Sequence, residues 1–143
     1  VKKVVGEVAL IHSVDSQRLA REIERVAAAE NLSQQVLLEV NVADEESKFG
    51  LAPQEAPALA SLIADMPHVE LVGLMTMAPI VSHAEKTRPF FACLRELAER
   101  IAAMELFART DFELSMGMTQ DFEVAIEEGA TLIRVGSALF KGI

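Results

Sequence analysis

Two segments near the C-terminus combine residue types that could hold a phosphate group. They are Leu114-Ser115-Met116-Gly117-Met118-Thr119 and Ile133-Arg134-Val135-Gly136-Ser137-Ala138-Leu139-Phe140. Each is expected to be a short apolar strand that ends in a turn of small residues and then enters a helix. Backbone N–H groups at a helix start attract anions, and glycine lets the backbone approach closely. The residues predicted to form one shared anion site are Ser115, Met116, Gly117, Gly136 and Ser137. The plain alternative is that these small residues only permit tight turns.

Arg134 is the most informative single residue, because it lies inside an apolar strand beside the predicted anion site. A buried arginine without a partner is costly. One interpretation is an ion pair with a strand carboxylate such as Glu113. The other is that the guanidinium faces the ligand and donates to a ring nitrogen or an anionic oxygen. A positive charge in that place would keep a ring nitrogen unprotonated.

Apolar periodicity predicts five strands that alternate strictly with four helices. The strands are expected at residues 8–14, 36–42, 69–75, 111–114 and 131–135. Strict alternation is typical of a parallel sheet with right-handed crossovers, and near-continuous apolar strands indicate a sheet buried on both faces. A barrel and an open doubly wound sheet both fit this pattern.

Local residues predict where the helices begin and end. Asp15 or Ser16 caps the first helix, and Pro53 begins the second unless Pro57 moves its start. Thr119 is expected to cap the fourth helix. Polar residues that follow the strands are expected at one edge of the sheet, where ligand sites of such folds gather. These residues, with one methionine among them, are His12, Ser13, Asn41, Met75 and Thr76.

Composition excludes several classes of function. The 143 residues carry a net charge of −9 and a pI near 4.8, which argues against a broad nucleic-acid interface or binding to anionic membranes. No apolar run reaches the roughly 18 residues that a transmembrane helix needs. The single cysteine, Cys93, excludes an internal disulfide and fits a reducing cytoplasm. The three histidines show no metal-binding spacing, so no metal site is expected.

Five motifs resemble those of the pyridoxal phosphate homeostasis proteins, single-domain relatives of the alanine racemase N-terminal barrel. They are LIHSVDS at 10–16, ESKFG at 46–50, GLMTM at 73–77, LSMGM at 114–118 with DFE at 121–123, and EGAT at 128–131 with RVGSA at 134–138. The resemblance implies a (β/α)8 TIM barrel that binds pyridoxal 5′-phosphate. It implies that Ser115, Gly117, Gly136 and Ser137 line the phosphate and that Arg134 lies near the pyridine nitrogen. It also implies a cytoplasmic carrier or regulator of the vitamin B6 pool with little or no turnover and no catalytic residue in this chain.

The comparison with that family also implies that residues 1–143 are a truncated barrel domain holding about strands four to eight. The family's Schiff-base lysine lies on the first strand, upstream of the motif that opens this chain, so this chain need not retain the cofactor. Lys48, among acidic neighbours, is interpreted as an ion-pairing residue. Five strands cannot close an eight-stranded barrel, and exposed strand edges drive association. We therefore expect pairing with the missing N-terminal segment or with a second copy of the chain.

Three other functions stay open at this point. A racemase-like enzyme would need a base on each face of the substrate carbanion. The chain contains no tyrosine to supply the second base that alanine racemase takes from another domain. Another phosphate-binding barrel enzyme would need carboxylates or lysines at the strand ends. A structural or interaction module is the third alternative.

Overall fold

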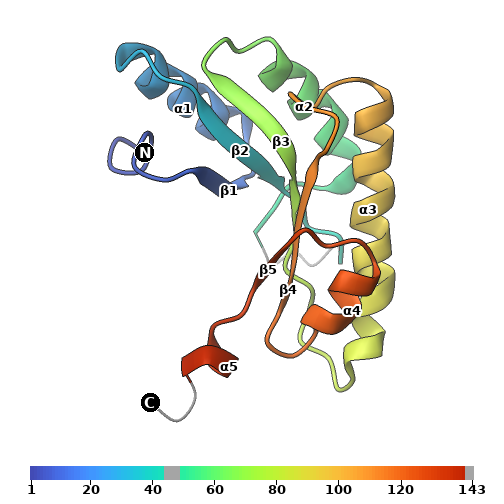
Figure 1. The fold of residues 1–143 in the computed structure, drawn as a ribbon. Helices are drawn as coiled ribbons and strands as arrows, with labels where there is room; N and C mark the ends of the chain where they lie inside the picture. Colours follow the sequence, from blue (N-terminus) through green and yellow to red (C-terminus); the bar gives the residue numbers. More distant parts are fainter. Residues whose placement is uncertain (44–48, 141–143) are drawn as a thin grey trace.

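The computed structural model describes residues 1–43 and 49–140, which form one parallel β-sheet with helices packed on one of its faces (Figure 1). The strands are β1 (Leu10–Val14), β2 (Gln34–Glu39), β3 (Val69–Met75), β4 (Glu113–Met118) and β5 (Leu132–Arg134). The helices are α1 (Gln17–Ala29), α2 (Ala56–Ala64), α3 (Arg88–Ala103), α4 (Phe122–Glu127) and α5 (Ser137–Phe140). Short 3-10 helices at Pro53–Glu55 and Ala84–Thr87 lead into α2 and α3. The strands lie in chain order, and every neighbouring pair is parallel.

The structure confirms the predicted alternation of strands and helices. Ser16 caps α1, since its side chain accepts a hydrogen bond from the Leu19 N–H at 3.1 Å. Pro57 lies in the first turn of α2, which begins after the 3-10 turn at Pro53. The prediction for Thr119 was wrong: the residue at the N-cap of α4 is Asp121.

Strand β4 is longer than the sequence predicted, because it runs to Met118 instead of ending at Leu114. Its first half pairs with β3, and its end pairs with β5 through Met118 and Arg134. Ser115, Met116 and Gly117 therefore belong to the strand and not to the turn after it.

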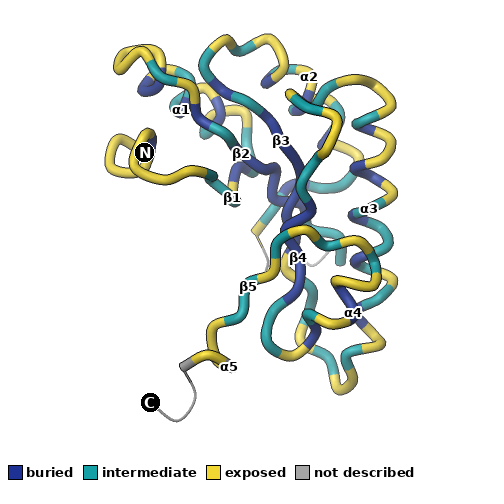
Figure 2. Tube along the Cα trace, in the orientation of Figure 1, coloured by how far each residue is buried: buried dark blue, intermediate teal, exposed yellow. Residues whose placement is uncertain are grey.

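Each face of the sheet carries its own apolar cluster. Leu38, Leu74 and Met116 belong to the large cluster that packs against α1, α2, α3 and α4. The opposite face, here called the concave face, carries a small cluster of buried residues, with two half-buried leucines packed against it. Its members are Leu37, Val72 and Met75, flanked by Leu10 and Leu132. Figure 2 shows that the central strands β2, β3 and β4 are largely buried, whereas the edge strands β1 and β5 are more exposed. In the described part of the chain, no helix is both long and apolar enough to cross a membrane.

The sheet is strongly curled toward the concave face. Leu10 on β1 and Leu132 on β5 pack against the same small cluster, although three strands separate them. In a flat sheet, four strand spacings would place β1 about 19 Å from β5. Within the described residues, β1 pairs only with β2, and β5 pairs only with β4. The result is a curved, five-stranded sheet with helices outside and two open edges.

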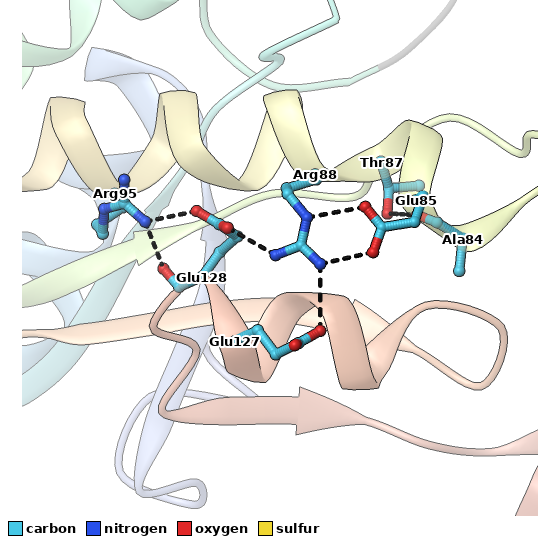
Figure 3. A network of polar contacts seen from close by, with 7 residues as sticks. All are labelled: Ala84, Glu85, Thr87, Arg88, Arg95, Glu127 and Glu128. Carbon is cyan, nitrogen blue, oxygen red and sulfur yellow. Dashed lines mark hydrogen bonds and ion pairs between the residues drawn. The ribbon is translucent and has the colours of Figure 1, made fainter.

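An ion-pair network joins α3 to α4 on the outer layer (Figure 3). Arg88, at the start of α3, donates to Glu85 and Glu127, and to Glu128 at 2.8 Å. Arg95, two turns further along α3, donates to the Glu128 carboxylate and also to its backbone carbonyl at 3.3 Å. The carboxylate of Glu128 is thus bound by two arginines at the C-terminal end of α4.

Gly73 allows β3 and β4 to approach closely. A methyl group at this position would lie 2.0 Å from the Glu113 carbonyl oxygen. We expect Gly73→Ala to reduce the free energy of unfolding by about 3 kcal/mol, because overpacking would separate paired strands. Gly136→Ala is the control, since its methyl would meet no atom within 4 Å. Urea unfolding of both variants would measure the difference, and equal midpoints would contradict the expectation.

Glu128→Gln should weaken the attachment of α4 in a pH-dependent manner. Hydrogen bonds from Arg88 and then Arg95 lower the pKa of Glu128 below its ordinary value. A depressed carboxyl pKa stabilises the fold above the unfolded-state pKa, and this contribution disappears as pH falls through the folded-state pKa. Thermal unfolding should therefore separate wild type from Glu128→Gln at pH 7 and bring them together in acid. Glu99→Gln, which removes only the exposed pair of Glu99 with Arg95 at 3.6 Å, should change little at either pH.

Candidate functional site

Polar groups from all five strands or their ends gather at the carboxyl edge of the concave face. His12, Glu39 and Ser115 alternate along their strands with residues of the helix-side cluster, so their side chains lie on the opposite face. Arg134 lies two residues after Leu132 of the concave cluster and therefore shares its face. The backbone carbonyl of Thr76, directly after β3, completes this set. We call these five residues the concave-face cluster. Ligand sites of parallel sheets lie at this edge.

His12 and Ser115 join distant strands across the concave face. His12 Nδ1 lies 2.9 Å from the Ser115 hydroxyl oxygen, although β2 and β3 lie between their strands. Ser115 is fully buried. Burial, followed by the positive charge of Arg134, lowers the pKa of His12 below its ordinary value. The lowered pKa favours the neutral imidazole of His12, whose ring provides one donor and one acceptor.

Arg134 faces the concave cluster. Its Nη2 donates to the Thr76 carbonyl at 2.6 Å, while its buried Nε has no hydrogen-bond partner among the described residues. Glu113 is not its partner, because that carboxylate accepts from Arg109 at 2.8 Å and from Thr131 at 2.6 Å. The predicted alternative of an Arg134–Glu113 pair was therefore wrong.

Two further carboxylates shape the electrostatics around this guanidinium. Burial lowers the pKa of Arg134, and the charges of Glu39 and Asp121 act in the opposite direction. Burial, followed by the charge of Asp15, raises the pKa of Glu39, while Arg134 acts against this increase. Glu39 is only 8% exposed. A single half-buried positive charge thus influences an acid on β2 and a histidine on β1.

The two glycine-containing segments leave the sheet side by side. Met118 pairs with Arg134, so β4 and β5 end at the same edge. Gly117 has φ +103°, and a methyl group there would lie 2.7 Å from the Ala125 side chain on α4. Gly117 is therefore required by the packing of β4 against α4, whatever else its backbone does.

The remaining predicted site residues differ in exposure. Gly136 and Ser137 are exposed, and a methyl group added at Gly136 would meet no atom within 4 Å. Met116 is fully buried in the helix-side cluster, so only its backbone could contact a ligand. The structure brings Ser115 and Arg134 into one cluster and places Gly136 and Ser137 directly after β5.

Sequence reasoning missed Glu39 and Asp121. Glu39 lies within an otherwise apolar strand, and its alternation with Leu38 and Val40 is the signal that assigns its side chain to the other face. Asp121 is buried, and its Oδ1 accepts from the Met118 N–H at 2.7 Å, which holds the turn after β4.

The other strand-end predictions had mixed outcomes. His12 and Thr76 belong to the concave-face cluster, and Met75 belongs to the apolar cluster of the same face. Ser13 is exposed, and Asn41 is half-buried. Lys48 and most of its acidic loop lie outside the described residues. Within the described residues, no three His, Cys, Asp or Glu side chains are grouped so that they could hold a metal ion.

A separate hollow lies on the surface, and its lining residue Leu51 donates its N–H to the Glu39 carbonyl at 3.0 Å. It is lined by Asp15, Ser16, Gln17, Leu51, Gln54, Glu55, Ala58, Leu59 and Leu62, between the start of α1 and α2. The concave face itself is open along the two unpaired strand edges, so its polar groups are not enclosed by the described part of the chain.

Comparison with known proteins finds relatives of this chain in one protein family. The model of the family described as alanine racemase, N-terminal domain, matches residues 1–143. The pyridoxal phosphate homeostasis protein of Aquifex aeolicus is 46% identical over 140 residues, which are 98% of this chain and 60% of that protein. The human protein of the same name is 36% identical over 137 residues, or 49% of its length. The chain thus spans about half to three fifths of these relatives.

Solved structures agree with this comparison. PipY of Synechococcus elongatus, in a structure with pyridoxal phosphate bound, matches 97% of this chain and 64% of its own, with a TM-score of 0.86 and 35% identity. Alanine racemase of Clostridium difficile matches with a TM-score of 0.77 over 97% of this chain and 37% of its own. Its 13% identity supports the shared fold alone.

Removal of the Arg134 charge should move two titrations in the same direction. The positive charge lowers the pKa values of both His12 and Glu39, so Arg134→Gln should raise both. NMR titration of the two side chains would measure this change. Arg95→Gln, on the helix side, is the control that should leave both pKa values in place. Unchanged titrations in Arg134→Gln would show that the guanidinium does not face this cluster.

Proposed function

The chain belongs to the family of alanine racemase N-terminal domains, and on this premise we propose that it binds pyridoxal 5′-phosphate and contributes to vitamin B6 homeostasis in the cytoplasm. One observation carries the proposal: the turns after β4 and β5 leave the same edge of the sheet beside the half-buried charge of Arg134. The names of the relatives described above support the choice of ligand. We propose a carrier or regulator without catalytic turnover of its own.

The proposed binding mode assigns the phosphate to the ends of β4 and β5. The Ser115 and Ser137 hydroxyls and the backbone amides around Met116, Gly117 and Gly136 would donate to it. The exposed position of Gly136 supports this assignment, because nothing in the described fold requires a glycine there. When bound, the cofactor supplies an aldehyde that reacts with amines.

Arg134 is assigned to the pyridine nitrogen. Its buried Nε lacks a partner among the described residues, so the fold leaves a hydrogen-bond donor unused. A guanidinium beside a ring nitrogen disfavours protonation of that nitrogen. The neutral His12 and the buried Ser115 would form the adjoining wall.

The curled sheet is proposed to be part of a TIM barrel, corresponding to about strands four to eight of a (β/α)8 domain. The unpaired edges of β1 and β5 and the apolar concave cluster support this proposal, since a closed barrel would cover all three. The partner that covers them is proposed to be an N-terminal segment or a second copy of the chain.

A second candidate function is an enzyme that uses the same site. One observation favours it: Glu39 is a buried carboxylate with a raised pKa, near the charge that also influences His12. Such perturbed groups can serve as general acid and base. Racemisation of alanine with added pyridoxal phosphate, compared between wild type and Glu39→Gln, would distinguish an enzyme from a carrier.

Ligand binding can be tested by equilibrium titration of the chain with pyridoxal 5′-phosphate. We expect saturable binding of pyridoxal 5′-phosphate. Pyridoxal, which lacks the phosphate, should bind at least about tenfold more weakly, and inorganic phosphate should compete with pyridoxal 5′-phosphate for the site. Gly136→Ala should weaken binding without loss of stability, because its methyl would enter the phosphate site and not the protein core. Equal affinity for pyridoxal and its phosphate would contradict the proposed site.

Open strand edges should make the isolated chain associate. Sedimentation velocity at micromolar concentration should show dimers or larger species, because unpaired apolar edges are covered by self-pairing. Addition of an N-terminal segment that holds the first barrel strands should convert these species into a single complex. A monodisperse monomer without that segment would exclude the association.

A further inference from the structure

We propose that Thr76 is a positioning residue that fixes the guanidinium of Arg134 on the concave face. Thr76 is fully buried and lies directly after the last residue of β3. Its carbonyl accepts from Arg134 Nη2 at 2.6 Å. Its other polar groups attach it to the strands on either side, so one residue connects four strands.

Two hydrogen bonds hold the Thr76 peptide in place. Its hydroxyl donates to the Val40 carbonyl, after β2, at 2.7 Å, and its N–H donates to the Ser115 carbonyl on β4 at 3.1 Å. A further bond from the Val40 N–H to the Met75 carbonyl, at 2.8 Å, closes the same junction. The carbonyl that receives Arg134 is thus anchored from β2 and from β4.

This anchoring is required because regular structure ends at Thr76. Residues 77–81 form an irregular loop, so no strand partner beyond Thr76 orients its carbonyl. The loop also has exposed apolar residues, with Ile80 87% exposed, and contributes little packing of its own. The Thr76 hydroxyl, through its bond to the Val40 carbonyl, therefore fixes a position that strand pairing no longer holds after β3.

The position of Arg134 decides where its charge acts. Glu39 from β2, Asp121 before α4 and His12 from β1 all interact with this charge. A guanidinium released from Thr76 could turn toward either carboxylate, since arginine donors accept a carboxylate readily. With the Thr76 carbonyl as its partner, Arg134 forms no ion pair with either acid among the described residues, and its Nε keeps no hydrogen-bond partner there.

Two variants test this role in the unliganded chain. Thr76→Val removes the hydroxyl and keeps the shape, whereas Thr76→Ser keeps the hydroxyl. Thr87→Val is the matched control, because Thr87 is also buried and its hydroxyl donates to the Ala84 carbonyl within its own 3-10 helix, not to a residue that binds Arg134. NMR would follow the Arg134 guanidinium resonances and the titration of His12.

We expect Thr76→Val to lose the separate, slowly exchanging Nη resonances of Arg134 and to raise the pKa of His12, because the positive charge moves away from the histidine. Thr76→Ser and Thr87→Val should keep the wild-type resonances and titration. If Thr76→Val fails to fold, Thr76→Ala serves as the second variant without a hydroxyl. Unchanged Arg134 resonances and His12 titration in the folded variant would overturn the proposal.

The consequence for the cofactor rests on the proposed function and can be separated from it. Thr76→Val should weaken binding of pyridoxal 5′-phosphate about tenfold, which corresponds to the loss of one oriented hydrogen bond to a charged group. If wild type does not bind the cofactor while the NMR changes occur, the proposed function fails and the positioning role stands. If binding occurs but Thr76→Val changes neither NMR nor affinity, the positioning role fails alone.

Discussion

The partly buried guanidinium of Arg134 is the charge around which the concave face is arranged. A positive charge removed from water must be compensated by hydrogen bonds or by opposite charges. The chain supplies a backbone carbonyl at 2.6 Å and two carboxylates whose charges favour the protonated arginine. It supplies no direct ion pair of Arg134 within the described residues. The arginine is therefore held by a hydrogen bond, while its charge is balanced only at a distance.

Curvature of the sheet makes this arrangement possible. In a flat sheet, β1 and β4 would be separated by about 14 Å. The curl brings His12 within 2.9 Å of Ser115 and lets residues of β1 and β5 share one apolar cluster. Helices cover the outer face and leave the inner face uncovered by the described part of the chain. The strand edges that stay unpaired in the described part of the chain therefore leave its polar cluster accessible.

The repeating elements of the fold could be predicted from the sequence, whereas the termini of elements and the partners of charges could not. Strand β3 was predicted to the residue because an apolar run lies between clear turn residues. Strand β4 was predicted too short, because Ser115 and Gly117 are residue types that favour turns. Both lie in the strand, and Gly117 adopts a positive φ there. Thr119 has the residue type of a cap, yet Asp121 occupies that position.

At the site, too, some residues could be predicted from the sequence while their partners could not. Arg134 could be predicted as a site residue because a charge in an apolar strand is unusual. Its partner is a backbone carbonyl 58 positions away, and residue types do not indicate which carbonyl an arginine will bind. Glu39 was missed because its run is apolar on both sides. Side-chain alternation assigns it to a face only when the face of its neighbours is known.

The short helix α4 shows how the outer layer bears on the inner edge. Six residues are too few for a helix to persist without outside contacts. Ala125 of this helix packs where β4 bends at Gly117, and Glu128 at its end is bound by two arginines of α3. Ionic strength acts on those outer contacts first, because they lie near the solvent. An increase in salt concentration would thus weaken the ion pairs that hold α4 and thereby change the geometry of the β4 turn, without any ion binding on the concave face.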